Sequence, residues 1–142
     1  MPLNLIKLAV GIEDLEHLER RQTQYRDKKT GNFAHRTRMM PQRQGDVLDG
    51  GSMYWVIRGL ILVRQPILSL SEGQDEHGKP LCVIELEPRQ ILVQPRAQRP
   101  FQGWRYLKAE DAPVDIAAGG KIYVDPTMPK AMRMELARLG LL

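Results

Sequence analysis

The chain has 142 residues, with one cysteine, 6% aromatic residues and no long apolar run. The single cysteine, Cys82, excludes an intramolecular disulfide and leaves a thiolate zinc site short of ligands. No apolar stretch reaches the roughly 18–20 residues that a membrane-spanning helix needs. Lys7 interrupts the apolar segment 1–10, which does not have the pattern of a signal peptide. We therefore expect a single cytoplasmic domain over residues 1–142, without a membrane partner, a metal site or a cofactor.

Sequence motifs of the common catalytic sites are also missing. Gly50-Gly51 and Gly119-Gly120 lack the spacing of a phosphate-binding loop, and no Gly-x-Ser-x-Gly turn occurs. The three histidines are widely separated. His35 is the one with a notable context, because it lies close to Arg36 and Arg38 and could act as a base in a cleft that binds polyanions. The sequence assigns no catalytic residue.

Periodicity predicts an α+β fold. Gly59 interrupts a strand pattern and predicts a bulge or a sharp bend, so we expect a small, strongly bent sheet or barrel. An N-terminal strand and helix precede the sheet strands, and a C-terminal helix follows them. The expected strands are 3–10, 35–40, 53–58, 60–70, 81–87, 91–93 and 121–124, and the expected helices are 12–28, 41–49 and 127–139.

Alternation along residues 53–58 separates two faces of a strand. Met53, Trp55 and Ile57 form an apolar set that belongs in the core, whereas Tyr54 and Arg58 lie on the opposite face. Cys82 alternates with apolar residues in the same way, which predicts a small core side chain rather than a nucleophile.

Charge is segregated along the chain. Residues 20–43 contain eight Lys or Arg residues and one acidic residue, and residues 89–108 contain five Lys or Arg residues and no acidic one. The chain as a whole carries 21 basic and 17 acidic residues, so these two stretches stand out against a nearly balanced background. We expect the two stretches to meet in the fold around Tyr54 and Arg58 and to form a patch that attracts polyanions. Charge runs of this kind also occur on ordinary solvated surfaces.

Aromatic residues are interleaved with these cations, a combination that holds single-stranded nucleic acid. In this interpretation the arginines contact phosphates, an aromatic ring stacks on a base, and Gln102 reads a base edge. The predicted ligand-binding residues are Arg36, Arg38, Tyr54, Arg58, Gln102, Trp104, Arg105 and Tyr106.

Two motifs carry a family resemblance. Residues 49–59, Asp-Gly-Gly-Ser-Met-Tyr-Trp-Val-Ile-Arg-Gly, and residues 99–108, Arg-Pro-Phe-Gln-Gly-Trp-Arg-Tyr-Leu-Lys, resemble domain-of-unknown-function family 1489, a group of short bacterial proteins. The opening Leu-Asn-Leu-Ile-Lys-Leu and the Arg-Met-Met-Pro at 38–41 are similar as well. The resemblance implies no activity. A weaker architectural likeness to PUA-like barrels, including ASCH and EVE domains, implies binding of RNA or modified bases.

Three functions are compatible with these features. The first is binding of RNA or a nucleotide through a basic, aromatic-lined cleft. The second is a small enzyme acting on a phosphorylated or nucleotide-like substrate, with His35 transferring a proton. The third is an adaptor that binds an acidic protein partner. The sequence does not determine the oligomeric state.

Overall fold

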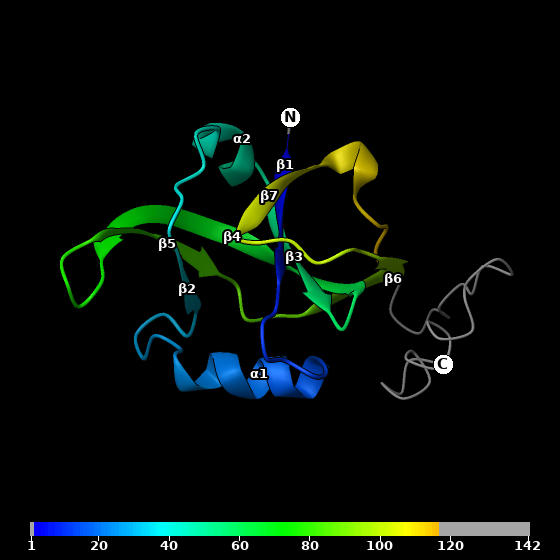
Figure 1. Cartoon of the computed structure of the whole chain (residues 1–142), viewed down its shortest axis with the longest axis horizontal. Helices are drawn as coiled ribbons and strands as arrows, with labels where there is room; N and C mark the ends of the chain where they lie inside the picture. Colours follow the sequence, from blue (N-terminus) through cyan, green and yellow to red (C-terminus); the bar gives the residue numbers. More distant parts are fainter. Residues whose placement is uncertain (1, 117–142) are drawn as a thin grey trace, which may run out of the picture.

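The computed structural model describes residues 2–116 and consists of one open, strongly bent sheet with two short helices (Figure 1). The strand order is β2-β5-β4-β3-β1-β7, with β6 also paired to β4. β1 and β3 are parallel, and the remaining strand pairs are antiparallel. This confirms the predicted α+β class with a bent sheet. The elements are β1 (Leu3–Leu8), α1 (Leu15–Gln24), β2 (Phe33–Thr37), α2 (Gln44–Leu48), β3 (Ser52–Ile57), β4 (Leu60–Gln74), β5 (Pro80–Leu86), β6 (Ile91–Ala97), β7 (Trp104–Lys108) and the 3-10 helix η1 (Ala109–Asp111).

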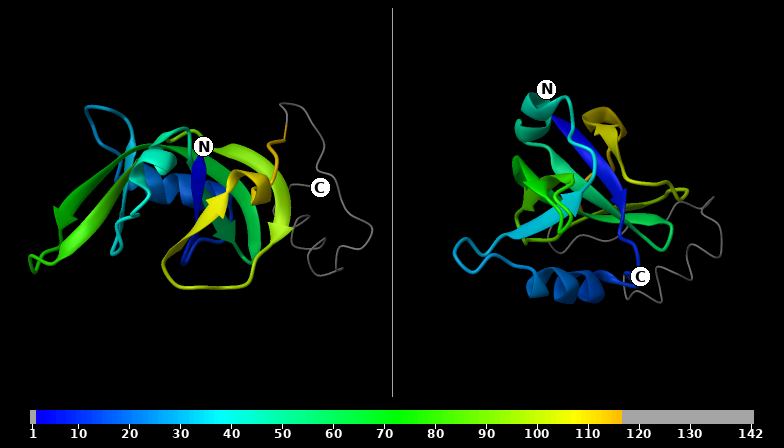
Figure 2. Two further views of the ribbon diagram at one scale, coloured as in Figure 1. Left: turned by 90° about the horizontal axis from the view of Figure 1, so that it is seen from above. Right: turned by 60° about the vertical axis from the view of Figure 1, so that its left-hand side comes forward.

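The bend of the sheet follows from β4, which is 15 residues long. Its first half pairs with both β3 and β6, and its second half pairs with β5. The pairing register shifts within each of these three ladders, and such bulges increase the local twist and bend the strand. Seen from above, β4 forms an arch (Figure 2).

Gly59 does not mark a bend within one strand. It forms a two-residue hairpin turn with Arg58, and the chain reverses direction between β3 and β4. Arg58 has φ 51° and Gly59 has φ 81°, which is the backbone pattern of a type I′ turn. A glycine is favoured at such a position because a left-handed backbone conformation is costly for other residues.

Helix α1 has an N-terminal cap and is shorter than the predicted helix 12–28. The Asp14 carboxylate accepts a hydrogen bond from the backbone N–H of His17 at 2.7 Å and so caps the helix. Beyond Gln24 the Asp27 carboxylate accepts hydrogen bonds from the backbone N–H groups of Lys29 and Thr30. This local turn replaces helical hydrogen bonds and ends the helix early.

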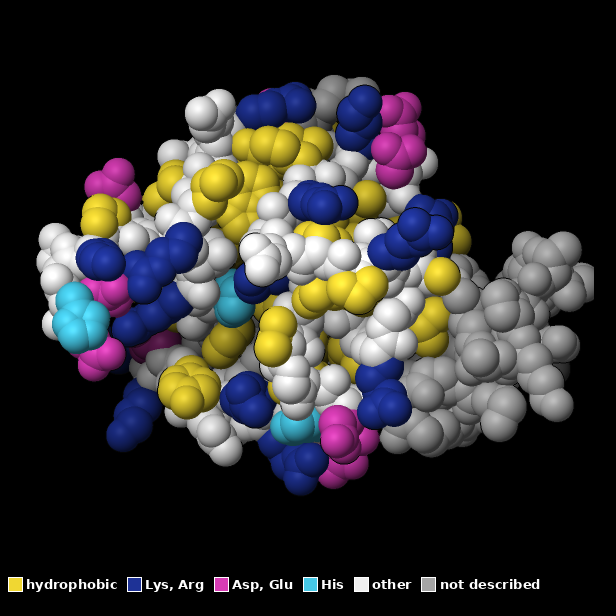
Figure 3. Space-filling view, viewed as in Figure 1, with side chains coloured by type: hydrophobic (Ala, Val, Ile, Leu, Met, Phe, Trp, Pro, Cys, Tyr) yellow, Lys and Arg dark blue, Asp and Glu magenta, His cyan; other side chains and the backbone are white. Residues whose placement is uncertain are grey.

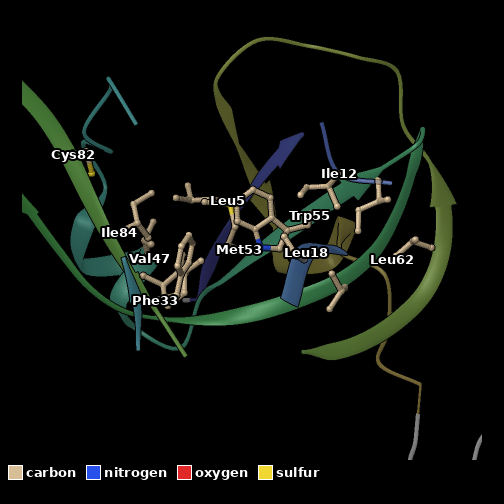
Figure 4. Close-up of a cluster of buried hydrophobic side chains, with 14 of the residues drawn as sticks. Leu5, Ile12, Leu18, Phe33, Val47, Met53, Trp55, Leu62, Cys82 and Ile84 are labelled. Carbon is tan, nitrogen blue, oxygen red and sulfur yellow. The ribbon is translucent and has the colours of Figure 1, made fainter. Parts of the chain in front are cut away.

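The larger core lies inside the arch of β4, where Figure 4 shows its side chains. Met53, Trp55 and Ile57 are all buried there, as alternation predicted, and Leu18 of α1 packs on them. Cys82 belongs to the same core, with its Sγ 3.5 Å from Sδ of Met40, and burial raises the pKa of its thiol. The prediction that Cys82 is a core residue is confirmed.

A second core lies on the other side of β1 and β3. Its buried residues are Ile6, Tyr54, Val56, Ile61, Val93 and Phe101. Residues 113–116 run beside β6, since the N–H of Gln94 donates to the carbonyl of Val114 and the N–H of Ile116 donates to that of Leu92. Both faces of the β1–β3 region are therefore covered.

Residues 104–108, which are not among the expected strands, form strand β7 at the edge of the sheet. The strand exists because it pairs with β1 over five residues, a long-range contact that local sequence does not reveal. The predicted strand 121–124 and helix 127–139 lie outside the described residues. Within the described part, no helix is long and apolar enough to cross a membrane.

The burial of Trp55 predicts its contribution to stability. Trp55 is 3% exposed, so Trp55→Ala should lower the free energy of unfolding by about 3–5 kcal/mol through lost transfer energy and a cavity. Val114 is 69% exposed, and Val114→Ala should change the same quantity by less than about 0.5 kcal/mol. Urea titration measures both. Equal stabilities of the two variants would contradict the core assignment.

Candidate functional site

A pocket of about 640 Å³ lies between α1, β2 and the end of β1. Its volume is within the range of roughly 300–1,000 Å³ that ligand pockets have. One wall is formed by residues 7–10 and a second by residues from α1, and Trp55 of β3 also contributes. The full lining is Lys7, Leu8, Ala9, Val10, Ile12, Leu18, Arg21, Gln22, Tyr25, Phe33, Ala34, His35, Arg36 and Trp55.

A buried amide pair fixes one wall of this pocket against the sheet. The side chains of Gln22 and Gln65 exchange two hydrogen bonds of 2.8 and 2.7 Å, and both residues are buried. The Trp55 indole N–H also donates to Oε1 of Gln65 at 2.9 Å, and Nε2 of Gln65 donates to the Pro88 carbonyl. These bonds hold α1, with its residues Arg21 and Gln22, over the Trp55 ring.

His35 contributes a partly buried ring to the pocket. Its ring meets the edge of Trp55 at a centroid distance of 5.1 Å and an angle of 89°. Burial, and to a smaller extent the charge of Lys7, lowers the pKa of His35 from 6.5 to about 4, so the imidazole is neutral at pH 7. Among residues 2–116, its Nε2 is the buried side-chain nitrogen or oxygen without a hydrogen-bond partner. A buried polar atom in that condition is costly, and it has almost no surface that a ligand could reach.

Three cations line the pocket, Lys7, Arg21 and Arg36, and no carboxylate is among its described lining residues. None of the three forms an ion pair within residues 2–116. Burial lowers the pKa of Lys7, so an anion bound beside it would stabilise the ammonium form. Figure 3 shows Lys and Arg side chains on one face of the molecule, around a central area where hydrophobic side chains reach the surface. Within the described part, no three His, Cys, Asp or Glu side chains are grouped to hold a metal ion.

The structure places the sequence-predicted site residues in several locations. Arg36 lines the pocket, and Gln102 lies at a neighbouring hollow. Arg38 forms an exposed ion pair with Asp75, with Nη2 2.9 Å from Oδ2. Arg58 is in the β3–β4 turn, and Tyr54 is only 6% exposed in the second core, where its ring offers no stacking surface.

The remaining predicted residues come from β7 and the loop before it. The guanidinium of Arg105 lies 4.6 Å from the centroid of the Phe101 ring. Trp104 and Tyr106 form an edge-to-face pair at 5.0 Å. Trp104 Nε1 donates to the carbonyl of Met39, and Arg43 N donates to the Tyr106 hydroxyl, at 2.7 and 3.1 Å. The two basic stretches therefore meet through these hydrogen bonds, and not around Tyr54 and Arg58.

Sequence reasoning missed Lys7, Arg21 and Tyr25, and it assigned Trp55 to packing alone. The sequence did contain a pattern that pointed to Lys7, because a cation within an otherwise apolar strand needs a structural or functional explanation. Arg21 and Tyr25 lie in the basic stretch 20–43, but no local pattern singles them out within it, since their role depends on which strand end lies under α1.

The neutral state of His35 predicts a pH dependence of stability. The unfolded chain takes up a proton near pH 6.5, and the folded chain does so only near pH 4. The free energy of unfolding should therefore fall as the pH drops from 6.5 to 4, by at most about 3 kcal/mol from this group. His35→Gln should lose that part of the slope, measured by urea titration at several pH values. Asp75 and Asp115 have pKa values below their usual 3.8, so their contribution is lost at lower pH. An unchanged slope in the variant would contradict this assignment.

The amide pair predicts a second stability difference. Gln22→Leu leaves part of the buried Gln65 amide without a partner and should lower the free energy of unfolding by about 1–3 kcal/mol. Gln24→Leu, at an exposed position on the same helix, should change it by less than about 0.5 kcal/mol. If the two variants are equally stable in thermal or urea unfolding, the pair does not fix α1.

The comparisons with known proteins give one match. No curated protein and no solved structure matches the chain significantly. Residues 5–142, nearly the whole sequence, match the family described as "Protein of unknown function (DUF1489)". The resemblance seen at residues 49–59 and 99–108 is thereby confirmed, and the chain belongs to this family.

Proposed function

We propose that the pocket binds a nucleotide, either free or as part of single-stranded RNA. The observation that carries this proposal is the combination of three cations and several aromatic rings in one pocket whose described lining residues include no carboxylate. Phosphate is an anion that such cations recognise, and a base is a group that stacks on such rings.

The residues divide into two groups by chemistry. Arg21 and Arg36 are exposed and suit contacts to phosphate oxygens, because guanidinium groups bind them in a fork. Tyr25, 65% exposed at the end of α1, offers a ring face for stacking. His35 adds a partly buried ring beside Trp55 to the pocket wall.

The pKa of His35 favours binding over proton transfer. A general base works best when its pKa is near the working pH, and about 4 is well below neutrality. A neutral imidazole held against Trp55 is suited to hydrogen bonding. We therefore place the enzyme hypothesis second. An acidic protein partner remains the third hypothesis, and the absence of nucleic-acid binding would favour it.

Salt dependence tests the proposal. A short fluorescein-labelled single-stranded oligouridylate should bind at low salt, with a log–log slope of about −0.7 for each phosphate contact. Arg21→Ala should flatten the slope by about 0.7 and Arg21→Ala with Arg36→Ala by about 1.4. Fluorescence anisotropy at several salt concentrations measures the slope, and circular dichroism verifies the fold.

Arg20→Ala is the matched control. Arg20 is the preceding residue on α1, is exposed, and is not part of the pocket lining. Its loss changes the net charge as Arg21→Ala does, but the slope should stay the same. Equal effects of the two variants, or no binding at low salt, would overturn the proposal.

A further inference from the structure

A second hollow, of about 480 Å³, adjoins the pocket. It is lined by Lys7, Leu8 and Val10 of the first pocket and by residues 100–103. The end of β1 is thus a wall shared by both hollows.

Lys7 is the charged residue common to the two. Within the described lining of the second hollow it is the one cation, and no carboxylate accompanies it. The other lining residues are mostly apolar. Phe101 is buried, and the Arg105 guanidinium lies 4.6 Å from the centroid of its ring. Gln102 is exposed. An apolar wall with one amide suits a flat ring that has a hydrogen-bonding edge.

The register of the sheet places Lys7 between two tryptophans. Lys7 pairs with Trp55 on β3 and with Trp104 on β7. Neighbouring strands are about 4.8 Å apart, so the three residues form a row across the sheet with the cation in the middle. Trp55 and Trp104 both pack against the larger core, which puts them on the same side of the sheet as Leu5.

We propose that the two hollows are subsites of one groove, and that its ligand is a single strand of at least two nucleotides whose connecting phosphate lies at Lys7. This inference rests on the proposed function and narrows it, because a mononucleotide would fill only one subsite. The first nucleotide occupies the pocket beside His35 and Trp55, and the base of the second lies in the second hollow beside Leu8 and Gln102.

The comparison of a mononucleotide with its dinucleotide tests this inference. The probes are 5′-AMP and 5′-phosphorylated ApA, with calorimetric titration of the full chain at low salt. The second base and the connecting phosphate should together tighten binding by about tenfold or more, since stacking of one base alone contributes roughly 5- to 150-fold. Gln102→Glu, which adds a carboxylate to the second hollow, should remove this gain.

Gln74→Glu is the matched control, with the same charge change at an exposed position in the β4–β5 hairpin, outside both hollows. It should retain the tenfold gain. Equal affinities of AMP and ApA would overturn the two-subsite groove but leave nucleotide binding in place. A gain that persists in Gln102→Glu would also overturn it, because the second nucleotide would then lie elsewhere. Failure of both probes to bind would instead overturn the proposed function itself.

Discussion

The reciprocal amide pair between Gln22 and Gln65 is the interaction on which the candidate site depends. Two buried amides satisfy each other, and the Trp55 indole joins them, so helix and sheet are held in one relative position. Apolar contacts alone tolerate sliding, whereas a misplaced amide leaves a buried polar group unsatisfied. Because α1 is fixed in this way, Arg21 and Tyr25 stay beside the sheet residues that complete the pocket.

The cations of the pocket do not serve to stabilise the fold. Lys7, Arg21 and Arg36 come from three separate elements and line one hollow without an acidic lining residue in the described part of the chain. A desolvated cation without a partner costs free energy, and His35 Nε2 adds a further unsatisfied group. Such groups are typical of sites that bind a ligand.

The bend of the sheet gives the chain two cores, with two hollows at the end of β1. The long strand β4 pairs with three other strands, and its bulges turn the sheet into an arch. One core fills the arch, and the other lies on the opposite side of β1 and β3. The end of β1 is left exposed to both hollows, which explains why Lys7 is only partly buried although it belongs to a central strand.

The sequence by itself determined the features that depend on neighbouring residues. Alternation along 53–58 separated Trp55 from Tyr54, the pattern around Cys82 indicated a core thiol, and the mixture of periodicities indicated an α+β fold with a bent sheet. These properties follow from backbone geometry, in which successive side chains of a strand point to opposite faces. Charge counting likewise found the basic stretches at 20–43 and 89–108.

Only the tertiary structure decided which of these residues meet. Tyr54 had the alternation of a surface residue, but β6 and Phe101 cover that face and bury it. Residues 104–108 became a strand through pairing with β1. Lys7 and Arg36 lie far apart in the chain, and no local pattern joins them. Long-range strand pairing and helix packing are set by the energy of the whole core, so the composition of the pocket is a property of the fold.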